Sequence, residues 1–212
     1  MKPPTLSPRR QRNYDAMKQS ILDAAREIMR ADGVAALTMQ ELARKVEIRP
    51  PSLYHYFASK MEIYDTLFRY GFQLFGEAMQ NAGERAGSFL EDLRLSMEAY
   101  MTFALENPDL FQLCFERHVP GFIPSEESLK VSIEALKRAT GRINARLERG
   151  EFSLDMPLPR VMDLTSAMMH GLVALHLANE PHLPLGQGRF GSLIPDAVSV
   201  FEKAWIKKNK LY

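Results

Sequence analysis

The sequence predicts an all-α protein of about nine helices, and three observations lead to this. Apolar residues recur at spacings of three and four along most of the 212-residue chain. No segment alternates apolar and polar residues with the β-branched content of a strand. Hydrophobic residues make up 46% of the composition, which allows a substantial core. The predicted helices cover residues 14–32, 38–45, 50–57, 59–82, 87–106, 108–117, 125–149, 158–179 and 192–208.

The first helix has a regular apolar face and a clear end. That face consists of Met17, Ile21, Ala24, Ala25, Ile28 and Met29. Gly33 ends the helix, because glycine readily leaves helical geometry. Residues 1–12 precede it with three prolines and several basic side chains, and we expect them to form a mobile basic arm.

Two short helices joined by a tight turn follow, which is the pattern of a helix-turn-helix. Thr38 and Glu41 fit a capping box, in which the Thr38 hydroxyl accepts from the Glu41 backbone N–H. Glu47 lies in the turn. Pro50 and Pro51 open the second helix, where no helical N–H is required.

The outer face of the second short helix predicts a DNA contact. Leu53 and Phe57 are four residues apart and point inward, which leaves a polar and aromatic outer set. This set consists of Ser52, Tyr54, His55 and Tyr56. Tyrosine and serine hydroxyls donate to phosphates, and helix N-termini at Thr38 and at Ser59-Lys60 would also hold them. For the two tyrosines, packing against the first helix is the alternative.

The charge distribution agrees with a polyanionic partner for the N-terminal part. Residues 1–60 carry 11 Lys or Arg against 6 Asp or Glu, a net charge of +5. The remaining residues carry 16 against 20, a net charge of −4. This asymmetry favours nucleic acid as the partner of the first sixty residues. In the arm, Arg9, Arg10 and Arg12 either enter a minor groove or only add non-specific attraction.

Three motifs in this region resemble the TetR (AcrR-like) family of regulators. They are Thr38-Met-Gln-Glu-Leu-Ala43, Ser52-Leu-Tyr-His-Tyr-Phe57 and Ser59-Lys60, after a helix that ends in Asp32-Gly33. The resemblance implies a homodimer of all-helical subunits, in which helices two and three bind DNA and the others form a dimerising, ligand-sensing bundle. It also implies the DNA contacts, which are Thr38, Arg49, Ser52, Tyr54, His55, Tyr56 and Lys60.

Two positions depart from the family pattern. Glu47 stands where the turn often carries Gly, so we expect a non-glycine residue at positive φ at a cost of about 1 kcal/mol. Pro50-Pro51 stands where the recognition helix often opens with Lys-Gly, which removes a cation and two backbone donors. We hypothesise that Arg49 supplies the missing charge.

The second half of the chain resembles the C-terminal class of this family that is named for its Trp-His-Gly motif. The resemblance rests on residues 99–115 and on Met169-His-Gly-Leu-Val-Ala-Leu-His176, where Met169 stands in place of the Trp. Together with methionine-rich apolar stripes, it predicts a pocket for a small effector. The predicted pocket residues are Met97, Tyr100, Met101, Phe111, Cys114, His118, Met169 and His170. The alternative is that these stripes are only core.

The last two long helices predict a dimer interface. The helix at 158–179 is apolar nearly all round, and one stripe of small residues allows a close approach of another helix. With the final helix, the interface would consist of Ala167, Gly171, Ala174, Ala178, Ala197, Phe201 and Trp205. The alternative is that both helices only fill a monomer core.

The sequence offers little support for catalysis or for a metal or cofactor. Residues 186–191 fit the spacing of a dinucleotide-binding loop, but a Pro-rich loop precedes them instead of a strand. The five histidines form no recognised metal-binding motif. The single cysteine, Cys114, and the lack of a signal-peptide pattern predict a cytoplasmic protein without membrane contact.

We therefore predict a sequence-specific DNA-binding transcriptional regulator, a repressor that a small apolar or amphipathic effector releases from operator DNA. The arm would cover residues 1–12, the DNA-binding domain 13–60 and the effector-binding and dimerisation domain 61–212. The effector would act by shifting the helix at 59–82. The alternative is a helical small-molecule-binding protein or enzyme with an incidental helix-turn-helix.

Overall fold

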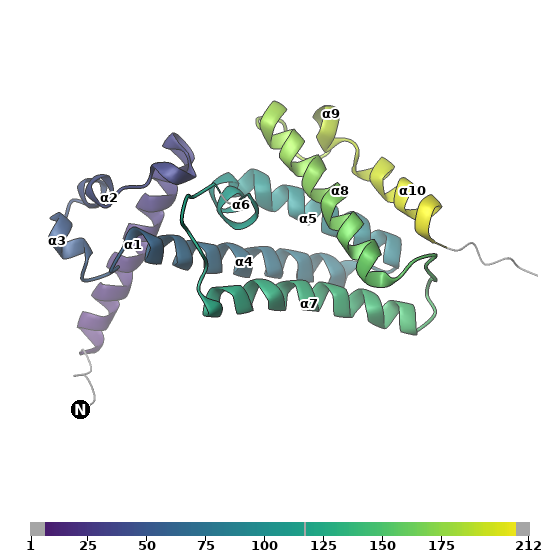
Figure 1. Ribbon diagram of the computed structural model, residues 1–212, viewed down its shortest axis with the longest axis horizontal. Coiled ribbons are helices and arrows are strands. Elements are labelled where there is room, and N and C mark those ends of the chain that lie inside the picture. The colour runs from purple at the N-terminus through teal and green to yellow at the C-terminus, as the bar shows by residue number, and fades with distance from the viewer. Residues whose placement is uncertain (1–6, 117, 207–212) are drawn as a thin grey trace, which may run out of the picture. The chain divides into compact units, whose positions relative to one another are not determined.

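The computed structural model describes residues 7–116 and 118–206. Within these ranges the chain forms helices and no β-strand, apart from an isolated antiparallel bridge between Leu154 and Ile206 (Figure 1). This confirms the predicted all-α class. The helices are α1 (Pro8–Asp32), the 3-10 helix η1 (Val34–Ala36), α2 (Met39–Lys45), α3 (Pro50–Leu53), α4 (Lys60–Arg85), α5 (Phe89–Glu106), α6 (Pro108–Phe115), α7 (Glu126–Glu148), α8 (Leu158–Asn179), α9 (Gly188–Gly191) and α10 (Ile194–Trp205).

The start of α1 corrects the predicted mobile arm. α1 begins at Pro8, so Arg9, Arg10 and Arg12 are exposed residues of a helix. Proline at the first helical position is favourable, because its fixed φ suits a helix and its missing N–H would have no partner there. Residues 1–6 of the predicted arm lie outside the described residues.

Most of the other helices differ from the predicted ranges by a few residues, and the third and the last predicted helices differ most. α3 ends at Leu53 instead of continuing to Phe57, and the backbone N–H of Tyr56 bonds to the Leu53 carbonyl at 2.9 Å in a turn. The predicted last helix begins at Ile194, and the one-turn helix α9 precedes it as a separate element. The predicted helix 158–179 agrees with α8 at both ends.

The described residues divide into two compact units. The first contains residues 7–71 and 109–128, and the second contains residues 72–108 and 129–206. α4 is continuous from Lys60 to Arg85 and contributes to both units. The predicted functional boundary near residue 60 therefore falls at the start of a helix, and the division into functional domains stays a prediction.

The core of the first unit forms around the apolar face of α1. Ile21, Ala25 and Ile28 are buried there, at the spacing that the sequence predicts. The Tyr64 hydroxyl of α4 donates to the Val34 carbonyl at 2.7 Å and so fixes η1. Burial raises the pKa of Tyr64 above its ordinary value of 10.0, so the neutral phenol remains the donor at physiological pH.

The core of the second unit forms where α5 packs against α8 and α10 (Figure 1). The ring of Phe89 in α5 stacks on Phe152, with centroids 3.8 Å apart, and lies 5.4 Å from that of Phe201 in α10.

Among the described helices, α8 alone is long and apolar enough to cross a membrane by length and composition. One such helix is weak support for a membrane span, because the core helices of soluble proteins pass the same test.

Candidate nucleic-acid interface and effector cavity

α2 begins with the predicted cap. The Thr38 hydroxyl accepts from the Glu41 backbone N–H at 3.2 Å, which satisfies one of the free donors of this helix end. Two cations of the last turn are paired: Lys45 lies 2.8 Å from Glu27, and Arg44 lies 3.6 Å from Glu41. Thr38 itself is exposed, so the start of α2 is accessible to a ligand.

The turn between α2 and α3 has the strained residue that the sequence predicts. Glu47 has a φ of 57° and is the one non-glycine residue at positive φ among those described. A side chain in this region costs about 1–2 kcal/mol relative to glycine. Arg49 follows as the exposed residue before α3, and no ion pair with another described residue is recorded for it. Its guanidinium is therefore available to an anionic partner.

α3 and the turn after it present a mixed polar and aromatic surface. Leu53 and Phe57 are fully buried, as predicted from their spacing. Tyr54 is 52% exposed, His55 is also exposed, and Ser52 is half-buried. An exposed tyrosine beside a histidine and a serine offers both hydrogen-bond donors and ring edges to DNA.

Tyr56 packs against α1, which is the alternative that the sequence left open. Its ring stacks on Tyr14, with centroids 5.0 Å apart and an angle of 27° between the planes. The Tyr14 hydroxyl donates to the His55 carbonyl at 3.4 Å. The ring of Tyr56 therefore helps to hold the turn after α3 on α1, whereas Tyr54 has no such role.

The start of α4 is capped by Ser59 and Glu62 in an arrangement close to a capping box, in which the Glu62 carboxylate binds the N–H before the cap residue instead of that of the cap. The Glu62 backbone N–H donates to the Ser59 hydroxyl at 3.3 Å, and the Ala58 N–H donates to the Glu62 carboxylate at 2.6 Å. Lys60 is the first residue of this helix and is half-buried. The remaining N–H groups of the first turn and the Lys60 ammonium form an end that suits a phosphate.

All seven predicted DNA contacts belong to the first unit. They lie at the start of α2, in and beside α3, and at the start of α4: Thr38, Arg49, Ser52, Tyr54, His55, Tyr56 and Lys60. Their role as DNA contacts stays a prediction.

The second unit contains a partly open cavity of about 90 Å³ between its helices, with the exposed Leu136 and Ser166 in its wall. Its wall is mainly apolar and includes Phe75, Met79, Leu93, Ile143, Met162 and Met169. These residues come from α4, α5, α7 and α8. The polar residues of the wall are Asp92, Ser96, Arg142, Thr165 and Ser166.

The predicted pocket residues are only partly brought together. Met169 lines the cavity. His170, the next residue in the sequence, forms a hydrogen bond of 3.1 Å with Tyr100. Met97 and Met101 are buried in the core of the second unit.

The other three predicted pocket residues, Phe111, Cys114 and His118, belong to the first unit. The Cys114 Sγ lies 3.6 Å from the Phe68 carbonyl oxygen, as expected for a small core side chain. His118 is exposed and lies 3.3 Å from the Glu116 carboxylate.

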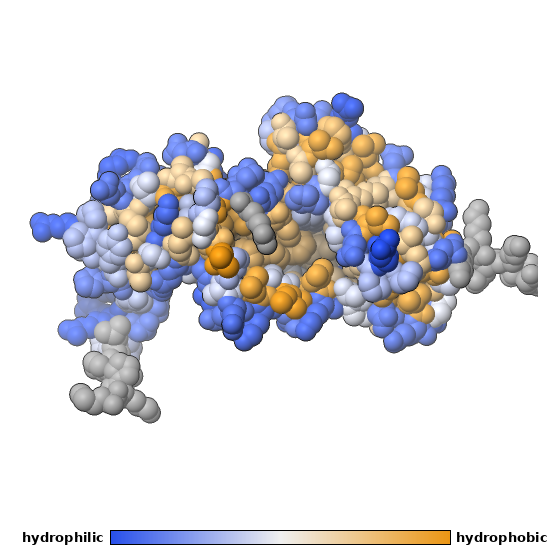
Figure 2. Space-filling model, viewed as in Figure 1, coloured by the Kyte–Doolittle hydropathy of each residue, from blue (hydrophilic) through white to orange (hydrophobic). Residues whose placement is uncertain are grey.

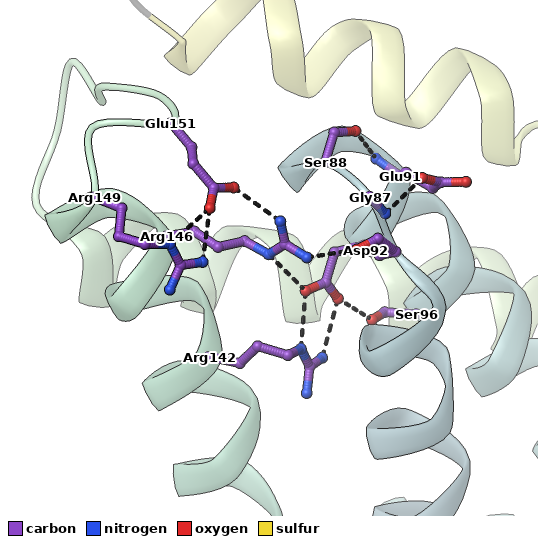
Figure 3. Close-up of polar contacts among 10 residues, drawn as sticks. Gly87, Ser88, Glu91, Asp92, Ser96, Arg142, Arg146, Arg149 and Glu151 are labelled. Atoms are coloured by element: carbon purple, nitrogen blue, oxygen red, sulfur yellow. Dashed lines mark hydrogen bonds and ion pairs between the residues drawn. The ribbon is translucent and has the colours of Figure 1, made fainter.

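A buried ion-pair cluster adjoins the cavity and was not predicted (Figure 3). Asp92 of α5 is 1% exposed, and Arg142 of α7 binds its carboxylate in a bidentate manner at 2.8 and 3.0 Å. The Ser96 hydroxyl donates to the same carboxylate at 3.2 Å, and the Nε of Arg146 lies 3.7 Å from it. The sequence signal was an acidic residue on the apolar face of the helix that contains Phe89 and Leu93.

The cluster continues to the end of α7. Arg146 donates to the Ala86 carbonyl at 2.7 Å and to Glu151 at 2.8 Å. Arg149 donates to the same carboxylate at 2.6 and 2.9 Å. Hydrogen bonds from these two guanidinium groups lower the pKa of Glu151, so it stays ionised.

One face of α8 is apolar and accessible. The predicted interface residues of this helix are exposed or half-buried: Ala167, Gly171, Ala174 and Ala178. Leu164 and Leu175 share this face by their spacing and are 44% and 46% exposed. Figure 2 shows apolar residues gathered on the surface of α8. The assignment of this face to a dimer interface stays a prediction.

Two residues of α10 correct the predicted interface. Phe201 is 1% exposed and Ala197 is 7% exposed, so both fill the core of the second unit. Trp205 is half-buried and packs edge-on against Phe201, with centroids 4.7 Å apart. Because Val200 is 56% exposed, the accessible face of α10 is the one that contains Val200.

Residues 7–116 and 118–206 contain no group of three or more His, Cys, Asp or Glu side chains that could hold a metal ion.

Two family descriptions match this sequence. Residues 21–67 match "Bacterial regulatory proteins, tetR family", and residues 93–193 match "Tetracyclin repressor-like, C-terminal domain". The first match contains all of α2 and α3, and the second contains α6, α7, α8 and α9. The narrower Trp-His-Gly class stays a prediction.

The chain is also similar to curated and solved proteins. It is 34% identical over 97 residues to the uncharacterized HTH-type transcriptional regulator YobS of Bacillus subtilis (strain 168). That alignment covers 45% of this chain and 49% of YobS, so the chain spans about half the length of this relative.

Two solved structures share the fold at low identity. A protein with unknown function from Rhodococcus sp. RHA1 has a TM-score of 0.76 and 19% identity, covering 90% of this chain and 95% of that chain. The transcriptional regulator FadR from Bacillus subtilis, in complex with stearoyl-CoA, has a TM-score of 0.66 and 17% identity, covering 86% and 96%. At these identities the likeness concerns the fold.

Proposed function

Because the chain belongs to the tetR family of bacterial regulatory proteins, we propose that it is a sequence-specific DNA-binding transcriptional regulator. The observation that carries this proposal is the surface around α3. There Arg49, Tyr54 and His55 are exposed within a helix-turn-helix whose inner side is fully packed. Exposed aromatic rings beside a cation are unusual on a surface that contacts only water. They suit a surface that binds DNA.

In this proposal, different residues have different tasks at the DNA. Arg49 replaces the cation that Pro50-Pro51 removes from the start of α3. Thr38 and Lys60 bind phosphates at two helix N-termini, and Tyr54 and His55 contact base edges or the backbone. Ser52 and Tyr56 complete the predicted set from the half-buried side of the same surface.

We further propose that the protein is a homodimer. The apolar face of α8, with its small residues and Leu164 and Leu175, supports this, and the accessible Val200 of α10 extends it. A twofold dimer presents two reading heads and therefore binds a pseudo-palindromic operator. The oligomeric mass in solution tests the dimer, and Leu175→Glu should shift it to the monomer because a charge would be buried in the interface.

The regulator is proposed to be a repressor that a small apolar or amphipathic effector releases from DNA. The mainly apolar cavity of the second unit supports an effector site, and the stearoyl-CoA in the FadR structure is an example of an amphipathic ligand in this fold. In keeping with the family, we propose that the protein acts in the cytoplasm and is not an enzyme. An effector that acts through α4 would weaken DNA binding, and DNA would weaken effector binding by the same factor.

Selection of bound fragments from genomic DNA by the purified protein tests the DNA-binding proposal. We expect enrichment of a pseudo-palindromic site, with an affinity that falls steeply as salt rises because phosphate contacts release counterions. Arg49→Ala should weaken binding to the selected site, whereas Arg138→Ala, an exposed arginine of α7, is the matched control. Fragments without any shared sequence would instead favour a small-molecule-binding protein with an incidental helix-turn-helix.

A further inference from the structure

Arg142 is the one cation in the wall of the effector cavity among the described residues. It binds Asp92 through Nε and one Nη, at 2.8 and 3.0 Å, which is the side edge of the guanidinium. In Figure 3 its other Nη points away from Asp92. A guanidinium has a second fork, between its two Nη atoms, that binds a carboxylate in the same bidentate manner. This second fork has no recorded partner among the described residues.

Asp92, by contrast, is already surrounded by donors. Its carboxylate accepts both Arg142 bonds and one from Ser96, and Arg146 lies within ion-pair distance. Its side chain is 2% exposed. A cationic ligand would therefore have to displace a bidentate arginine, which makes Asp92 a poor receptor for an ammonium group.

The charge balance of the cluster points the same way. Three guanidinium groups, those of Arg142, Arg146 and Arg149, share two carboxylates, Asp92 and Glu151. The cluster therefore has a net charge of +1 beside a mainly apolar wall. A single anionic group placed there would neutralise it, and its hydrogen bonds would be strong in such surroundings.

We propose that the effector is an apolar monocarboxylate, whose carboxylate binds the free fork of Arg142 while its hydrocarbon part fills the cavity. This inference rests on the proposed function, since it names the class of effector for the proposed effector site. Apolar side chains such as Phe75, Leu93 and Met162 would bury the hydrocarbon part. Ser166 is exposed at the wall and offers a further hydroxyl.

The size of the cavity limits the ligand. A volume of about 90 Å³ is below the roughly 150 Å³ of a cavity that accepts benzene and far below that of a drug-sized pocket. The wall contains the methionines Met79, Met162 and Met169, whose unbranched side chains adapt readily. A short chain of about four to six carbons suits these limits, and the methionine side chains would have to shift for the longest of these chains.

Arg142 also gives the carboxylate a route to α4. A Cβ added at Gly83 of α4 would overlap the Arg142 guanidinium, so the guanidinium lies directly on the backbone of that helix. A ligand that pulls on Arg142 therefore acts on the helix that begins beside the helix-turn-helix at Lys60. Position 83 is the contact through which effector binding would reach α4.

Calorimetric titration of the full chain with hexanoate, hexan-1-ol and hexylamine tests this inference. We expect hexanoate to bind at least tenfold more tightly than the alcohol, and the amine not to bind. Affinity should rise about fourfold per added CH2 from butanoate to hexanoate, because each methylene is buried. Arg142→Gln should weaken hexanoate at least tenfold while leaving the alcohol unchanged. Arg138→Gln, an exposed arginine one turn earlier, is the matched control.

Each other outcome is informative. If Arg142→Gln does not fold, the double variant Asp92→Asn/Arg142→Gln removes both charges and should lose the preference for hexanoate over hexan-1-ol. Equal binding of the alcohol and the carboxylate, tighter binding of the amine, or no binding of any monocarboxylate from four to six carbons would overturn the inference. A protein that binds its selected DNA but no carboxylate keeps the proposed function. A protein that binds hexanoate but no specific DNA keeps the carboxylate site at Arg142, but it loses the proposed function and with it the role of the carboxylate as an effector.

Discussion

Asp109, in the first turn of α6, is held by Arg26 of α1: the Arg26 Nε donates to its carboxylate at 2.7 Å. Arg30, one turn further along α1, donates to the other carboxylate oxygen at 2.9 Å. The Asp109 side chain is 0% exposed and that of Arg26 is 15% exposed. This ion pair joins α6 to α1 within the first unit, although 83 residues separate the two side chains in sequence.

Removing the charge of Asp109 should destabilise the first unit strongly. Asp109→Asn leaves Arg26 buried without its counter-ion, which typically costs about 3–5 kcal/mol in the free energy of unfolding. The urea midpoint of the variant measures this. Asp23→Asn is the matched control, because Asp23 is an exposed residue of α1 that binds only Gln19 in the described contacts. Equal losses for both variants would show that the buried pair does not stabilise the protein.

Because of Cys114, the free energy of unfolding should depend on pH in the alkaline range. Burial, and then the negative charge of Asp109, raise the pKa of its thiol above the ordinary value of 9.0. The unfolded chain therefore loses this proton first as pH rises, so the free energy of unfolding is unaffected below about pH 8 and decreases through pH 9 and above. Urea midpoints of the wild type at about pH 7 and 10, compared with those of Cys114→Ala, isolate this contribution.

In Cys114→Ala we expect a constant offset from the lost packing and a smaller decrease at alkaline pH. Burial of Tyr64 also raises the pKa of its phenol and contributes in both proteins, so only the difference between them counts. Identical alkaline decreases would mean that the thiol titrates normally in the folded protein.

The strained turn before α3 offers a second test of stability. Glu47 has a φ of 57°, where a Cβ is unfavourable. Glu47→Gly should raise the free energy of unfolding by about 0.5–1 kcal/mol, since relief of the strain exceeds the entropy that glycine adds to the unfolded chain. Glu47→Ala keeps the Cβ and loses the same carboxylate, so it should resemble the wild type. A gain shared by both variants would be due to the charge and not to the backbone.

Tyr54 and Tyr56 should respond differently to substitution. Tyr54 is 52% exposed, so Tyr54→Ala should weaken binding to the selected DNA about tenfold or more without changing the melting temperature. Tyr56 stacks on Tyr14, so Tyr56→Ala should lower the stability by about 0.5–1.5 kcal/mol beyond the loss of buried area. DNA titration and thermal unfolding of both variants separate the two roles. If Tyr54→Ala also unfolds earlier, the exposed ring has a structural partner.

Local patterns account for the parts of the fold that the sequence predicted well. The apolar spacing around Ile21 and Ile28 and the cap at Thr38 are decided by neighbouring residues, and both are confirmed. The positive φ of Glu47 was also predicted, because the turn has a known shape that most side chains do not favour. These features need no knowledge of distant parts of the chain.

Tertiary contacts account for what the sequence did not predict. Asp92 and Arg142 are separated by 50 residues, so their pair can be recognised only in the folded chain, where the Arg142 side chain of α7 reaches Asp92 of α5. Phe201 was assigned to an interface because a core residue and an interface residue share the same spacing. The cavity of the second unit is lined by residues of five helices, α4, α5, α7, α8 and α10, and of the predicted pocket set only Met169 lines it.

Gly83 and Gly141 provide a matched pair for the last prediction. Both lie inside helices, where Ala is favoured over Gly by up to about 1 kcal/mol. A Cβ at Gly141 of α7 meets no atom within 4 Å, so Gly141→Ala should raise the free energy of unfolding by about this amount. A Cβ at Gly83 would instead occupy the place of the Arg142 guanidinium and break its bidentate pair with Asp92. The lost buried pair outweighs the gain in helix propensity, so Gly83→Ala should lower the stability by about 1–3 kcal/mol. Urea unfolding of both variants measures these opposite effects. A stabilised Gly83→Ala variant would mean that Arg142 moves aside at little cost and that its pair with Asp92 contributes little to the fold.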